Sequence, residues 1–215
     1  MDKSPTSHAL RATMSVTPVI AIVRLPGADH AARVASALHA GGILVIEITL
    51  TTGGALEAVG VMRRAGLDGL CVGVGSVRTV DDARRAIDAG AEYLVTPTLN
   101  LDVVGAARSS GVPIVCGGLT PTELDAASRA GADYVKLFPA SAVGPRYVRE
   151  VLAPIPDLRI VPTGGVNAGN IGDYRAAGAV GAGIGSALVD RDTVAAEDWD
   201  TLEQRATSLV GAWRG

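Results

Sequence analysis

The chain has 215 residues, of which 48% are hydrophobic and 19% are charged, and it contains 27 glycines. This length allows one sizeable core, and the composition is typical of a strand-rich α/β protein with many tight turns, which excludes a disordered chain. The formal net charge of −3 provides no basic field for nucleic acid or for an anionic membrane surface, so neither partner is expected.

The amino-terminal segment is polar, and we expect residues 1–17 to include an extra helix, near 4–15, that closes one end of the fold. The first apolar run, 18–23, is too short for a signal-peptide core or a membrane span. This pattern predicts a protein of the cytoplasm.

The cysteines and histidines form no metal-binding pattern. Cys71 and Cys116 both lie in apolar, strand-like runs, where cysteine behaves as a small buried hydrophobe. His8, His30 and His39 all lie early in the chain, and none is near an acidic cluster. We therefore expect no metal site and no cofactor.

A residue pair ending in glycine recurs before short apolar runs along most of the chain. Successive pairs lie roughly 20–25 residues apart, apart from one gap of double length, and this is the period of one helix plus one strand. In each unit the glycine is expected to end a helix in a left-handed conformation. The glycines are Gly41, Gly66, Gly90, Gly111, Gly131 and Gly178.

Eight such units predict a closed parallel (β/α)8 TIM barrel, formed by residues 1–215 as a single domain. An open doubly wound sheet is the alternative, but the Arg-Leu-Pro-Gly sequence at 24–27 is not the glycine-rich loop that such a sheet requires after its first strand. The expected helix starts are Thr79 or Asp81, Asn100, Thr120 and Asn167. The expected strands are 18–24, 43–49, 70–74, 93–96, 112–116, 134–138, 159–162 and 180–184, and the expected helices are 29–40, 54–65, 79–89, 101–110, 121–130, 144–153, 168–177 and 198–213.

Two charged residues lie inside apolar strands. Lys136 lies in Tyr-Val-Lys-Leu-Phe, and Glu47 lies in Leu-Val-Ile-Glu-Ile. Burial disfavours the charged form of both side chains, and a neutral amine condenses with ketones to a Schiff base while a carboxyl group transfers protons. The structural alternatives are a lysine that reaches solvent at a strand end and a buried ion pair.

Glycine turns follow the last two expected strands. Gly164 and Gly165 follow Thr163, and Gly185 precedes Ser186. In a barrel these positions often bind phosphate through backbone N–H groups, although glycines can also serve only to allow tight turns.

These motifs resemble those of the bacterial 2-keto-3-deoxy-6-phosphogluconate / 4-hydroxy-2-oxoglutarate aldolases, which are class I enzymes. The resemblance extends over about residues 16–213 and rests on Val-Ile-Glu-Ile-Thr at 45–49, Val-Gly-Val-Gly-Ser-Val at 72–77, Tyr-Val-Lys-Leu-Phe-Pro-Ala at 134–140, Pro-Thr-Gly-Gly-Val at 162–166 and Gly-Ser at 185–186. It implies a (β/α)8 barrel, a homotrimer, no metal, and reversible cleavage of a keto-acid sugar phosphate to pyruvate and glyceraldehyde 3-phosphate.

The resemblance also implies roles for individual residues. Lys136 corresponds to the Schiff-base lysine, Glu47 to the proton-shuttling glutamate, and Phe138 to an aromatic ring over the bound keto acid. Pro97 and Thr49 correspond to the substrate pocket. The phosphate end is implied to comprise Thr163, Gly164, Gly165, Gly185 and Ser186.

The chain departs from the family pattern at three positions. Thr51 stands where many members have an arginine that binds the substrate carboxylate, and we expect Arg24 to take over that role. Ser76 replaces the usual threonine and keeps its hydroxyl group. Ser141 replaces an acidic residue and makes the 138–145 segment similar to the 6-phosphogalactonate aldolases.

Several functions therefore remain open from the sequence. The substrate is the gluconate phosphate, the galactonate phosphate or the unphosphorylated 4-hydroxy-2-oxoglutarate. A phosphate-binding isomerase or epimerase would explain the glycine turns without a role for Lys136 as a nucleophile. A non-catalytic binding protein for sugar phosphates would require neither buried charge.

Overall fold

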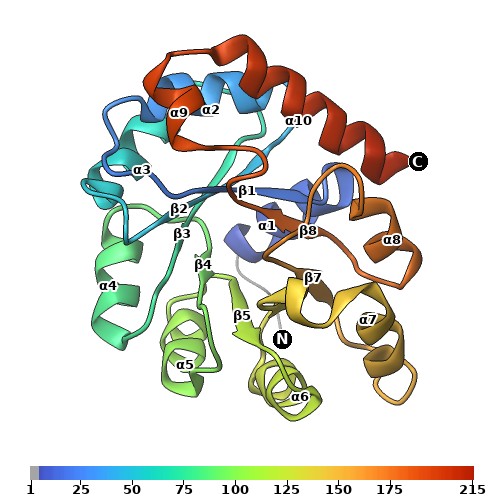
Figure 1. Ribbon diagram of the computed structural model, residues 1–215. Coiled ribbons are helices and arrows are strands. Elements are labelled where there is room, and N and C mark those ends of the chain that lie inside the picture. Colours follow the sequence, from blue (N-terminus) through green and yellow to red (C-terminus); the bar gives the residue numbers. More distant parts are fainter. Residues whose placement is uncertain (1–4) are drawn as a thin grey trace.

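Eight short strands lie at the centre of the computed structural model, and helices surround them (Figure 1). The structure describes residues 5–215, with side chains from Leu10 onward. The strands are β1 (Val19–Val23), β2 (Val45–Thr49), β3 (Cys71–Gly75), β4 (Leu94–Val95), β5 (Ile114–Gly118), β6 (Tyr134–Leu137), β7 (Ile160–Pro162) and β8 (Ala182–Ile184).

The strands form one parallel sheet in the order β7-β6-β5-β4-β3-β2-β1-β8. A single bridge between Thr163 and Gly183 joins the two outer strands, so the sheet closes on itself. The predicted single (β/α)8 barrel is therefore confirmed, and the open doubly wound sheet is excluded.

A helix follows every strand, as the repeat predicts. The helices are α1 (Pro5–Val16), α2 (Ala31–Ala40), α3 (Ala55–Arg64), α4 (Val80–Asp88), α5 (Leu101–Ser109), α6 (Pro121–Ala130), α7 (Gly144–Leu152), α8 (Ile171–Ala176), α9 (Arg191–Ala195) and α10 (Trp199–Arg214), with a 3-10 turn η1 (Ala140–Ala142). The sequence did not predict η1 and α9. None of the helices in residues 5–215 is long and apolar enough to cross a membrane.

Side-chain caps fix several helix starts. Thr79 and Thr120 each accept a hydrogen bond from the third residue of the helix, and Asn100 accepts one from the N–H of Val103 at 3.0 Å. The prediction of Asn167 as a helix start is wrong. Its side chain accepts a hydrogen bond from Gly169, so a turn precedes α8, which begins only after Asn170.

The predicted glycine stops are confirmed at five of the six positions, which have φ between 66° and 103°. Gly41 is the exception, because its φ is −76° and the left-handed residue is Gly42 instead. Gly41 lies against α10, where a Cβ atom would overlap Ala206 and the carbonyl group of Glu203. Close packing of two helices, rather than a turn, therefore requires this glycine.

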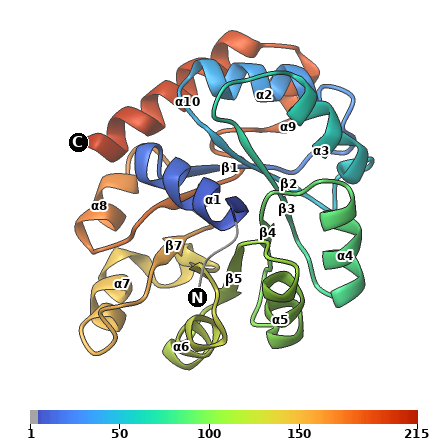
Figure 2. The same ribbon diagram turned by 180° about the vertical axis from the view of Figure 1, so that it is seen from behind.

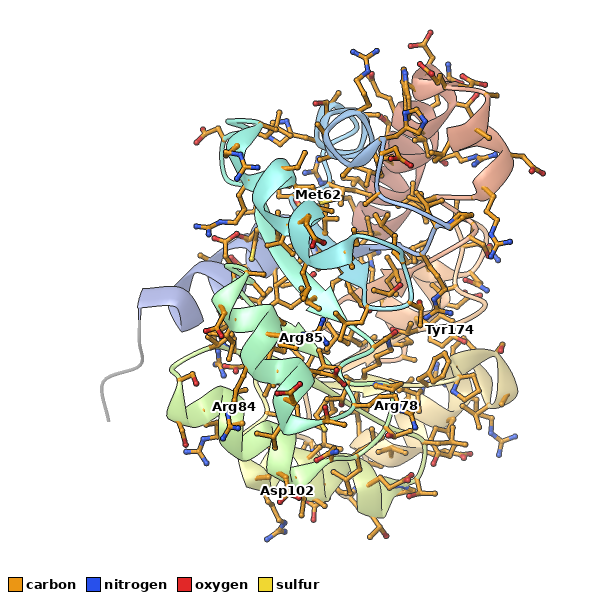
Figure 3. The ribbon with its side chains drawn as sticks, turned by 90° about the vertical axis from the view of Figure 1, so that its left-hand side faces the viewer. Met62, Arg78, Arg84, Arg85, Asp102 and Tyr174 are labelled. Carbon is orange, nitrogen blue, oxygen red and sulfur yellow. The ribbon has the colours of Figure 1, made fainter. Side chains whose placement is uncertain are left out.

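Two apolar clusters make up the core. The larger lies between the strands and the surrounding helices, and Met62 of α3 belongs to it, while Arg84 and Asp102 extend outward from α4 and α5 (Figure 3). The smaller fills the barrel interior and includes Leu10 and Met14 of α1.

The helix α1 covers one end of the barrel (Figure 2). Arg11 of this helix forms an ion pair with Asp133, before β6, at 3.0 Å. The expected extra helix near 4–15 is thus confirmed for the described residues, and the opposite end of the barrel is left for the site.

Candidate active site

The candidate site lies at the carboxyl ends of the strands, where the side chains that point into the barrel come together. In the interior cluster, Ile22 belongs to β1, Val45 to β2, Tyr134 to β6 and Val161 to β7. Side chains two residues apart on a strand point to the same face. The next inward positions are Arg24, Glu47, Lys136 and Thr163.

Lys136 and Glu47 are the only Asp, Glu, Lys or Arg side chains that are buried among the described residues, with exposed fractions of 6% and 2%. Lys136 pairs in register with Gly117 on β5 and Val161 on β7. Its Nζ atom lies 5.3 Å from the centroid of the Phe138 ring.

The two buried charges do not form a structural ion pair. None of the ion pairs of the described residues includes Lys136 or Glu47, and the Oε1 atom of Glu47 has no hydrogen-bond partner there. Burying an unpaired ionisable group costs stability, and such groups concentrate at functional sites. The arrangement therefore favours a chemical role for both side chains over a structural one.

A cavity of about 580 Å³ opens at this end of the barrel. It brings together eight of the predicted site residues: Arg24, Lys136, Phe138, Thr163, Gly164, Gly165, Gly185 and Ser186. The lysine amine and the glycine turns after β7 and β8 thus share one cavity.

The glycine turns present backbone donors to this cavity. Gly164 and Gly165 have φ of 92° and 76°, which favours glycine at both positions. Within the described chain, no hydrogen bond outside the strand pairings uses the N–H groups of Gly165, Gly185 or Ser186. Free N–H groups arranged in turns are suited to bind the oxygens of an anion.

The other five predicted residues do not line the cavity. Glu47 is the register partner of Ile22 on β1, and Ile22 does line the cavity. The hydroxyl groups of Thr49 and Thr51 are 2.9 Å apart, and Thr51 is exposed. The remaining two, Ser76 and Pro97, follow β3 and β4.

Sequence reasoning did not predict four residues of the cavity wall. Asn167 and the residues Asp190, Arg191 and Asp192 also line the cavity. Asp190 caps α9 and bonds to Arg205, and the Thr193 side chain and N–H, followed by Arg205, hold the pKa of Asp190 well below its usual value. The Asp-x-x-Thr pattern at 190–193 is the sequence signal for this cap.

Arg205 thus engages Asp190, while Arg191 takes part in none of the ion pairs formed by residues 5–215. The cavity wall therefore offers the guanidinium groups of Arg24 and Arg191 as well as the amine of Lys136. Among the described residues, no group of three or more His, Cys, Asp or Glu side chains is placed to hold a metal ion.

Comparison with known proteins identifies relatives of this chain. The family model described as KDPG and KHG aldolase matches residues 10–205. The 2-dehydro-3-deoxy-phosphogluconate aldolase of Treponema pallidum is 38% identical over 197 residues, covering 90% of this chain and 93% of the relative. The probable 2-dehydro-3-deoxy-6-phosphogalactonate aldolase of Rhizobium meliloti is 34% identical and covers 91% of each chain.

A solved structure has the same fold and a ligand. The KDPG aldolase of Legionella pneumophila, with pyruvate captured at low pH as a covalent carbinolamine intermediate, superimposes with a TM-score of 0.84. It is 25% identical, and the match covers 96% of this chain and 98% of the other.

Proposed function

We propose that this chain, which belongs to the KDPG and KHG aldolase family and is an aldolase, works as a class I enzyme through a Schiff base on Lys136. The proposed reaction is the reversible cleavage of 2-keto-3-deoxy-6-phosphogluconate to pyruvate and glyceraldehyde 3-phosphate. Membership of this family favours an aldolase over the isomerase, the epimerase and the non-catalytic binding protein.

One observation carries the proposal: Lys136 is buried, unpaired and on the wall of the cavity. Its amine attacks the C2 carbonyl of the keto acid to give a carbinolamine, which loses water to form an iminium ion. The positive iminium nitrogen accepts the electron pair of the C3–C4 bond when that bond breaks. The products are an aldehyde and an enamine, which gains a proton at C3 and is hydrolysed to pyruvate.

Glu47 is the proposed proton carrier of these steps. A carboxyl group can give a proton to the departing water and take one from the C4 hydroxyl group as the carbon–carbon bond breaks. Glu47 is the only other Asp, Glu, Lys or Arg side chain that is buried among the described residues, and it is the register partner of the cavity-lining Ile22. A buried, unpaired carboxyl group next to the cavity supports this role.

The two ends of the substrate have different proposed partners. Arg24 is exposed to the cavity and takes the C1 carboxylate in place of the arginine absent at Thr51. The free N–H groups of the glycine turns bind the phosphate, and Arg191 adds a positive charge there. Among the predicted pocket residues, Phe138 covers the keto acid and Thr163 lies beside it on the cavity wall. Thr49, Ser76 and Pro97 do not line the cavity, and their contact with the substrate stays a prediction from the family resemblance.

The alternative substrates are 2-keto-3-deoxy-6-phosphogalactonate and 4-hydroxy-2-oxoglutarate. The relative from Rhizobium meliloti supports the first, and the KHG part of the family description supports the second. The three compounds should be compared at equal concentration, with pyruvate release followed by lactate dehydrogenase. We expect the gluconate phosphate to have the highest kcat/KM. A higher value for either alternative would replace it as the substrate.

Two further properties stay predictions: the homotrimer, from the family resemblance, and the cytoplasmic location, from the amino-terminal sequence. A homotrimer would be recognised by sedimentation equilibrium, and a monomer in that experiment would contradict it. The cytoplasmic location would be tested by fractionation of cells that express the full chain.

A further inference from the structure

Two polar atoms in the barrel interior lack a hydrogen-bond partner among the described residues. They are the Oη atom of Tyr93 and the Oε1 atom of Glu47. Both side chains are buried, with exposed fractions of 0% and 2%. Leaving a buried polar group unsatisfied destabilises the fold, so each such atom in a folded protein requires a physical explanation.

The two side chains lean over the same strand from opposite sides. Glu47 on β2 pairs in register with Gly73 on β3, and the pairing of Val74 with Leu94 brings Tyr93 beside Gly73 on the other side. Gly73 and Gly75 are successive inward positions of β3. A Cβ atom at Gly73 would overlap the Tyr93 ring, and one at Gly75 would overlap the Glu47 carboxyl group.

The two side chains lie against successive inward positions of one strand, yet they form no direct hydrogen bond with each other. A direct hydrogen bond between two oxygen atoms is about 2.8 Å long. A single water molecule with one hydrogen bond to each side spans up to about 5.6 Å. Glu47 is one of the charges that raise the pKa of Tyr93, which places the two groups near each other.

The surroundings of Tyr93 keep its hydroxyl group neutral. Burial, followed by the neighbouring Cys71, Glu47 and Glu92, raises the pKa of Tyr93 well above its usual value. A neutral tyrosine hydroxyl is both a hydrogen-bond donor and an acceptor. It can therefore bond to a water molecule in either direction.

We propose that Tyr93 is a positioning residue for Glu47 and that one internal water molecule bridges its hydroxyl group to the carboxyl oxygen. This inference rests on the proposed role of Glu47 as the proton carrier. The bridge satisfies both orphaned atoms and gives the water the two polar partners that a buried water requires at minimum. The interior cluster with Leu10 and Met14 of α1 separates it from solvent at the closed end of the barrel.

The bridge holds the carboxyl group in both of its protonation states. When Glu47 is ionised, Tyr93 donates to the water and the water donates to Oε1. When Glu47 carries a proton, it donates to the water and the water donates to the tyrosine oxygen. Within the bridge, only Glu47 changes its charge, so the carboxyl group keeps its orientation through the catalytic cycle.

The test is Tyr93→Phe, which removes the hydroxyl group and keeps the ring over Gly73. The step to measure is the exchange of the C3 protons of pyruvate in D₂O, followed by NMR, because it reports enamine formation. We expect this rate and kcat to fall by about tenfold, the effect of losing one hydrogen bond. KM and the borohydride-trapped pyruvate adduct on Lys136 should remain.

The matched control is Tyr134→Phe. Tyr134 lies in the same interior cluster, but its hydroxyl group accepts a hydrogen bond from Arg159 at 2.8 Å. This variant should lose stability while keeping the wild-type exchange rate.

The outcomes separate the two proposals. If Tyr93→Phe forms the adduct and exchanges the C3 protons at the wild-type rate, the proposed role of Tyr93 is overturned, while the proposed function stands. A raised Tm of this variant would strengthen that conclusion. A wild-type protein that forms no adduct overturns both proposals. If Tyr93→Phe does not fold, a high-resolution crystal structure of the wild type decides. The absence of electron density for a water molecule between Tyr93 and Glu47 would overturn the bridge.

Discussion

The substitution Gly75→Ala tests the position of Glu47 without touching Glu47 itself. A Cβ atom at Gly75 would lie 2.6 Å from the Cγ atom of Glu47 and closer still to its carboxyl group. An ordinary contact between carbon atoms is about 3.5–4.0 Å, so the side chain must move by about 1 Å. A misplacement of that size costs about 10²-fold in rate, and we expect kcat to fall by that factor.

The assay is pyruvate release coupled to lactate dehydrogenase, with circular dichroism to confirm folding. The matched control is Gly105→Ala on the exposed face of α5, where a Cβ atom meets nothing within 4 Å. It should keep the wild-type kcat and gain up to about 1 kcal/mol of stability from helix propensity. A folded Gly75→Ala variant with the wild-type kcat would refute the placement of Glu47 in the reaction.

Three further predictions concern other parts of the structure. Arg24→Ala should raise the KM of all keto-acid substrates, whereas Arg191→Ala should raise only that of phosphorylated ones; an unchanged KM in the first variant would remove Arg24 from the site. Thr193 and then Arg205 lower the pKa of Asp190, so its ionised form stabilises the fold above about pH 4 and the benefit is lost as the pH falls further. The Tm difference between wild type and Asp190→Asn should therefore shrink below pH 4, and a constant difference would contradict this. Burial raises the pKa of Cys71 to about 12, so iodoacetamide at pH 8 should label it only after unfolding, and rapid labelling of the native protein would show that the thiol is accessible.

Local patterns were enough to predict the barrel. Glycine at a helix end and an apolar run after it are short-range signals, and their repetition specifies the number and order of the units. Gly41 was misinterpreted because its reason is packing against Ala206, which is distant in the sequence. The short helix α9 was missed because its five residues contain no helical repeat of apolar positions.

The site was predictable where a residue type conflicts with its surroundings. A lysine or a glutamate within an apolar strand stands out, and this identified Lys136 and Glu47. Tyr93 gives no such signal, because a tyrosine in a strand normally fills a core, and its unsatisfied hydroxyl group becomes visible only in three dimensions. Arg191 was missed because an arginine in a loop is ordinary until the fold brings it to the cavity.

The central claim is that Lys136 forms a Schiff base, and the sequence allows an unusually clean test. The chain contains two lysines, Lys3 and Lys136, and the peptides that carry them are easily distinguished. The protein should be incubated with pyruvate, reduced with borohydride, digested and examined by mass spectrometry, with Lys136→Met as the control. We expect one adduct, on Lys136, and we expect the control variant to show neither the adduct nor activity. An active protein without that adduct would contradict it.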